Sequence, residues 1–157
     1  MLALSIAEQD IKGFMDKLLR DGAFDGFETR SVEVVSLTRF EISGIAMDKP
    51  ETGNEPQSRF CKWEALKPFV FQMVKGSRKP KLVKVSFAAD EHTVSALHPN
   101  AQALFINITY ENNIIQCTTG TAQKNFDMDK SLPEAWDAYV RNFFAAQGIP
   151  VVENEFR

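Results

Sequence analysis

The sequence predicts an α+β fold, with an antiparallel sheet and helices packed on one of its faces. Several short segments alternate apolar and polar residues, which is typical of strands with one solvated face. Three other segments repeat apolar residues at the spacing of an amphipathic helix. Hairpins fit the connections between strands better than parallel crossovers do. The predicted order is therefore strand, helix, two strands, helix, three or four strands and a final helix.

The N-terminal segment changes period from strand to helix. Residues 2–6 alternate, and the following residues place apolar side chains on one helical face as Ile11, Phe14, Met15, Leu18 and Leu19. Gly22 is suited to end this helix because glycine tolerates a left-handed backbone. Residues 27–45, rich in Val, Thr, Phe and Ile with interleaved charges, predict two antiparallel strands.

A second helix is expected after a polar loop. Residues 47–58 contain two prolines and a glycine without periodicity, so we expect a mobile loop. Trp63, Leu66 and Val70 then begin an apolar stripe that ends at Gly76. Pro68 has no N–H to donate, so this helix is expected to begin near Ala65 or to kink there.

The middle of the chain predicts a meander of strands. Residues 83–87, 104–110 and 114–121 alternate as strands do, and residues 90–100 form a polar connection. Asn112 and Asn113 tolerate positive φ and predict a two-residue hairpin turn. A further strand is expected over residues 124–128.

The last helix has the clearest start signal. Ser131 and Glu134 have the spacing of a capping box, and Gly148 and Pro150 end the apolar pattern that follows. We therefore expect one α+β domain over residues 1–148 and a loose tail over residues 149–157.

The composition excludes several classes of protein. Of 157 residues, 44% are hydrophobic and 25% charged, which is typical of a globular domain rather than a disordered chain. Apolar runs are too short to span a membrane, and the N-terminus lacks the basic start of a secretory signal, so a cytoplasmic location is expected. The two cysteines are expected to be reduced and structural.

Few residues in the chain are suited to catalysis. The only two histidines, His92 and His98, lie in a polar segment beside Asp90 and Glu91, without the spacing of a metal site. We therefore predict no cofactor and no metal, and favour a non-enzymatic module. A small-molecule-binding protein or a hydrolase that uses either histidine with Asp90 is the alternative.

One segment concentrates positive charge in a chain of net charge −3. Residues 75–84 include five basic residues and no acidic one: Lys75, Arg78, Lys79, Lys81 and Lys84. Such a cluster favours phosphate contacts through counterion release, and its alternative role is that of a solubilising turn. Through this surface we expect a nucleic-acid or protein partner.

Four runs along nearly the whole chain resemble a bacterial family known only as a domain of unknown function. They are residues 10–19, 63–68, 117–121 and 129–136, which read DIKGFMDKLL, WEALKP, CTTGT and DKSLPEAW. The resemblance implies no activity and no site residues.

The order of elements over residues 1–129, with a second helix entered by the run FCKWEAL, resembles one domain of a DNA polymerase sliding clamp. That resemblance implies helices that turn basic side chains toward DNA. It adds four residues to the candidate DNA-facing surface, namely Lys12, Lys17, Arg20 and Lys67.

Overall fold

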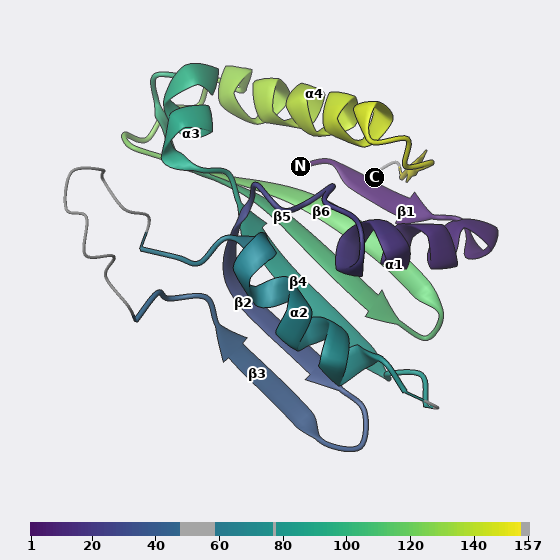
Figure 1. Cartoon of the computed structure of the whole chain (residues 1–157). Helices are drawn as coiled ribbons and strands as arrows, with labels where there is room; N and C mark the ends of the chain where they lie inside the picture. Colours follow the sequence, from purple (N-terminus) through teal and green to yellow (C-terminus); the bar gives the residue numbers. More distant parts are fainter. Residues whose placement is uncertain (48–58, 77, 155–157) are drawn as a thin grey trace.

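A computed structural model describes residues 1–47, 59–76 and 78–154 as one sheet with helices on one face (Figure 1). The strand order is β3-β2-β4-β5-β6-β1-β7, and every neighbouring pair is antiparallel. The strands are β1 (Ala3–Ile6), β2 (Glu28–Val35), β3 (Arg39–Ser43), β4 (Leu82–Ala88), β5 (Ala101–Glu111), β6 (Ile114–Gln123) and β7 (Val152–Glu153). The predicted antiparallel α+β fold is confirmed.

The helices are α1 (Ile11–Leu19), preceded by a 3-10 turn η1 (Glu8–Asp10), α2 (Trp63–Val74), α3 (Glu91–Leu97) and α4 (Ser131–Ala146). Figure 1 shows α1 and α2 over the sheet and α4 along its upper end. The buried residues of these helices join those of the strands in one apolar cluster. No helix in the described part of the chain is long and apolar enough to cross a membrane.

Alternation along the strands separates a covered face from an open face. Val83, Val85 and Phe87 of β4 are buried under the helices. Lys84 points to the open face, between Glu33 of β2 and Thr109 of β5 in the strand register. A shift of one residue would reverse these faces, so burial of the apolar set specifies the register.

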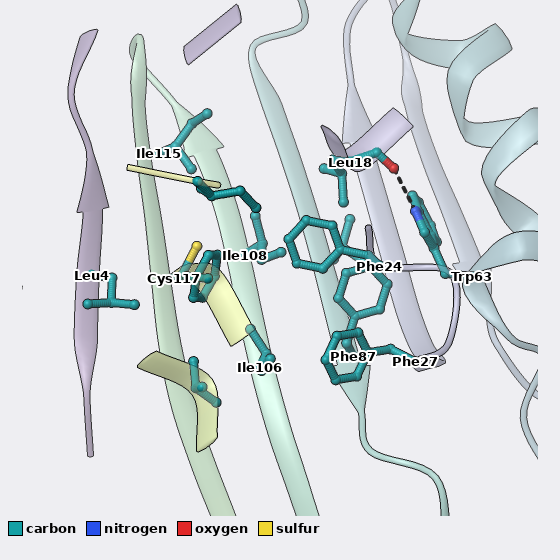
Figure 2. Close-up of a cluster of buried hydrophobic side chains, with 14 of the residues drawn as sticks. Leu4, Leu18, Phe24, Phe27, Trp63, Phe87, Ile106, Ile108, Ile115 and Cys117 are labelled. Carbon is teal, nitrogen blue, oxygen red and sulfur yellow. Dashed lines mark hydrogen bonds between the residues drawn. The ribbon is translucent and has the colours of Figure 1, made fainter. Parts of the chain in front are cut away.

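Aromatic rings fill the centre of the core (Figure 2). Phe24, which is completely buried, stacks on Phe87 at 5.6 Å between ring centroids and meets the edge of Phe14 at 5.9 Å. Trp63 meets Phe87 edge-on at 5.1 Å, and its indole N–H donates to the backbone oxygen of Leu18 at 2.7 Å. These contacts hold α1, α2 and the sheet together.

Two predictions about helices need correction. The second helix begins at Trp63 and continues through Pro68, because the Trp63 amide is already bonded to the oxygen of Phe27 at 2.9 Å and its buried ring fixes the first turn. Ser131 belongs to α4 itself, and its amide donates to the Asp129 carboxylate at 3.0 Å, so the expected Ser131–Glu134 capping box does not form the helix start.

Three segments also differ from expectation. The polar connection at residues 90–100 contains α3, whose start is capped by Asp90. The strand expected at residues 124–128 is absent, since β6 ends at Gln123. The expectation of a loose tail is wrong for residues 152 and 153, because they form β7, which pairs with β1, and Glu153 binds Arg141 at 2.6 Å. The mobile loop predicted at residues 47–58 falls, except for Met47, outside the described residues.

The two cysteines differ in exposure, and both are free thiols. Burial raises the pKa of Cys117 to about 12, so its thiolate is negligible at neutral and mildly alkaline pH. Cys61 is only half-buried. We expect Ellman's reagent to modify Cys61 in the native protein and to reach Cys117 only after denaturation. Two rapidly reacting thiols at pH 8 would contradict this expectation.

Candidate binding groove

A groove of about 720 Å³ lies between α1, the C-terminal end of α2 and the segment that follows it. β5 contributes Tyr110, and the β5–β6 turn contributes Asn113. That turn has the predicted form, with φ of 52° at Asn112 and 59° at Asn113. Three parts of the chain that are far apart in sequence therefore form one concave surface.

The floor of the groove is apolar. Ile11, Met15 and Leu19 repeat every four residues along α1, so they form one row on its surface. Phe71 and Val74 of α2 face this row. Phe14 and Leu18 of the α1 stripe pack into the core, and Leu19, which is buried too, belongs to both the core and the floor. The apolar face of α1 is thus wide enough to serve both the core and the groove.

The rim of the groove is basic. It carries Lys12, Arg20, Lys75, Arg78 and Lys79. Among the described residues that line the groove, Asp16 is the one acidic residue. The rim thus opposes the net charge of −3 of the whole chain, and its field favours an anion.

The rim cations differ in how they are engaged. Arg20 lies 3.7 Å from the Asp16 carboxylate, and its guanidinium lies 5.5 Å from the centre of the Phe71 ring. The other four rim cations form no ion pair with a carboxylate of the described residues. They are Lys12, Lys75, Arg78 and Lys79. These four cations are available to an incoming ligand.

Comparison with known proteins identifies the family. Residues 17–151 match a family described as a family of unknown function (DUF5721). The chain belongs to this family. No curated protein and no solved structure matches the chain. The match to the family begins inside α1, so Ile11, Lys12, Met15 and Asp16 of the groove precede it, and the other groove residues lie within it.

The structure brings together five of the nine basic residues predicted as a nucleic-acid surface: Lys12, Arg20, Lys75, Arg78 and Lys79. Lys67 lies elsewhere and is engaged, since it binds Asp25 at 2.8 Å and the backbone oxygen of Asp21 at 3.0 Å, with 14% of its side chain exposed. Lys17 lines a separate cavity of about 100 Å³.

The remaining two basic residues, Lys81 and Lys84, also lie outside the groove. Lys81 precedes β4 and donates its amide to Val35, while Lys84 lies on the open face of the sheet. Sequence reasoning missed the groove floor, although the breadth of the apolar stripe on α1 was visible in the sequence.

The histidines belong to helix ends. His98 Nδ1 accepts from the Asn100 amide at 3.0 Å, so Nε2 carries the proton and donates to Ser131 Oγ at 2.9 Å. The Ser131 hydroxyl in turn donates to Asp129 at 3.1 Å, and the hydrogen bonds from Ser131 lower the pKa of that carboxyl. In this tautomer His98 cannot take the Ser131 proton. The trio differs from a catalytic triad, in which the carboxylate holds the histidine.

Asp90, the carboxylate expected beside the histidines, also has a structural role. Its side chain accepts from the Thr93 amide at 2.8 Å at the start of α3. Partial burial has the largest single effect and raises the pKa of Asp90, but the hydrogen bonds from Thr93 and the nearby charge of Lys62 together lower it. His92 is exposed on α3. Within the described ranges, no three His, Cys, Asp or Glu side chains gather as a metal site would require.

Proposed function

We propose that this protein is a non-enzymatic binding module whose groove takes an acidic protein segment with apolar side chains. The observation that carries the proposal is an apolar floor enclosed by a basic rim on which four cations have no ion-pair partner among the described residues. Apolar side chains gain free energy on leaving water, and carboxylates are attracted to the rim. A ligand with both features can contact the floor with its apolar side chains and the rim with its carboxylates.

The size of the groove favours a short segment. From Ile11 to Arg20 the helix advances nine residues, or about 14 Å at 1.5 Å per residue. An extended chain covers that length with about four residues at 3.3 Å each. Four consecutive residues with alternating apolar and acidic side chains would therefore fill the groove.

Nucleic acid is the second candidate partner. It is favoured by the convergence of five predicted basic residues on one rim, where they would contact phosphates. The groove favours it less, because bases bind single-stranded sites by stacking on exposed aromatic rings. Of the two rings in the lining, Tyr110 is only 8% exposed and Phe71 has the Arg20 guanidinium 5.5 Å from its centre. The sliding-clamp resemblance belongs with this candidate and stays a prediction.

Charge reversal at Lys79 is expected to weaken ligand binding, whereas reversal at Lys81 is not. Lys79 lines the groove and Lys81, two residues further on and also exposed, does not. As a probe we choose anilinonaphthalene sulfonate, an anion with an apolar body. We expect saturable binding that K79E weakens about fivefold, equivalent to about 1 kcal/mol, and that K81E leaves unchanged.

Near-UV circular dichroism of the same samples would show that dye binding reports the native state, since partly folded states also bind this dye. Equal affinity for the wild type, K79E and K81E would contradict the proposal. For the second candidate, labelled single-stranded and duplex DNA would be titrated at low and physiological salt. Binding that falls with salt and depends on Lys79 would favour nucleic acid, and no binding at low salt would exclude it.

A further inference from the structure

The connection between β6 and α4, residues 124–130, is exposed throughout. Two large apolar side chains on it face solvent, Phe126 with 90% and Met128 with 84% of their surface exposed. Asp127 and Asp129 alternate with them. We call residues 124–130 the FDMD loop. Exposed apolar side chains are ordinary when they are scattered, but two of them held together on one loop suggest a contact surface.

Hydrogen bonds hold this loop near its start, at Asn125, and in its middle, at Asp127. The Asn100 side chain donates to the Asn125 oxygen at 2.9 Å and accepts from the Asn125 amide at 3.0 Å. Gln123 likewise donates to and accepts from the backbone of Asp127, both at 3.0 Å. Because the loop is ordered before it meets a partner, binding loses less conformational entropy.

The FDMD loop has the chemistry that the groove requires. Its central run offers two apolar side chains for the floor and two carboxylates for the rim, in a segment of four residues. Asp127 accepts from the Asp129 amide at 2.9 Å and Asp129 accepts from Ser131, so the carboxylates would meet the rim with their remaining lone pairs. The estimated length of the groove is also about four extended residues. The lysines of the loop, Lys124 and Lys130, flank the central run, and Lys130 directly follows Asp129.

A chain cannot place this loop in its own groove. Asn113, at one end of β6, lines the groove, whereas the FDMD loop follows Gln123 at the other end. The ten residues of β6 span about 33 Å at 3.3 Å per residue. Figure 1 shows the β5–β6 turn at the lower right and the connection to α4 at the upper left.

We infer that the FDMD loop of one copy binds the groove of a second copy, so that the protein associates head to tail. This inference rests on the proposed function of the groove and names its partner. Such an interface joins two different surfaces of the same chain, so association continues into open chains or closes into rings. Because the contact is small, the association is weak and depends on concentration.

Sedimentation velocity over a series of concentrations tests the inference with two variants. F126S/M128S removes the apolar side chains of the loop, and K75E/K79E reverses the charge of the rim; all four positions are exposed. We expect the average mass of the wild type to rise with concentration and both variants to stay monomeric. A mixture of the two variants should form a heterodimer and nothing larger, because only one loop and one groove remain intact.

Two matched controls separate these effects from general changes of the surface. L37S removes an apolar side chain that is 85% exposed in the β2–β3 turn, and K81E reverses a charge outside the groove. Both should associate as the wild type does. A monomeric wild type, association of either double variant alone, or a mixture without heterodimer would overturn the inference. The two proposals can also fail separately. If K79E weakens dye binding but the wild type is monomeric, head-to-tail association is overturned and the groove proposal stands.

Discussion

Replacing Gly44 with alanine is expected to destabilise the fold by at least about 3 kcal/mol. A Cβ atom at this position would lie 1.6 Å from the backbone oxygen of Thr29. The obstacle is backbone, so no side-chain rotation relieves the clash. Gly44 also donates its amide to Arg30 at 3.0 Å and accepts from the Cys61 amide at 2.7 Å. Urea denaturation followed by circular dichroism would measure the loss.

Gly13 offers a matched control for Gly44. It lies within α1, and a Cβ atom there would meet nothing within 4 Å. G13A is therefore expected to stabilise the protein by about 0.5 to 1 kcal/mol, because alanine has the higher helix propensity. A G44A protein as stable as the wild type would contradict the close approach of β3 to β2 at Thr29.

Replacing Trp63 with alanine is expected to cost about 3 to 5 kcal/mol. The indole is completely buried, meets Phe87 edge-on and donates to the Leu18 oxygen (Figure 2). Leu18 lies in the last turn of α1, where carbonyl oxygens lack a helical donor. The substitution therefore leaves both a cavity and a buried oxygen without a partner.

W63F separates these two contributions. Phenylalanine retains much of the ring volume but cannot donate to Leu18, so we expect a smaller loss of about 1 to 3 kcal/mol. Urea unfolding of the wild type and both variants would give the two differences. Equal losses for W63F and W63A would mean that the hydrogen bond, rather than the volume, dominates.

Regular periodicity predicted most of the secondary structure because it depends on near neighbours. The predicted strand at residues 83–87 corresponds to β4, which extends it by one residue at each end. The missed α3 has only Val94 buried, so it carries no apolar stripe. The strand expected over residues 124–128 does not form. A strand needs a neighbouring strand to bond its backbone, and here the side chains of Asn100 and Gln123 take that role.

The candidate site was predicted only in part. The basic segment at residues 75–84 was found as a run, but its members separate in space: Lys79 reaches the groove, and Lys84 lies on the open face because strand residues alternate. Lys67 was indistinguishable in sequence from a free surface lysine. Its ion pair with Asp25 joins residues that are 42 positions apart.

The sequence by itself determined the class of fold, the main strands and helices, the hairpin at Asn112 and Asn113, and the presence of a local excess of positive charge. Each of these follows from residue types within a few positions of one another. Only the tertiary structure decided which cations share a surface, that an apolar floor lies between them, and that the FDMD loop stands at the opposite end of β6. Those features depend on contacts between distant segments, which the packing of the helices on the sheet creates and local patterns do not encode.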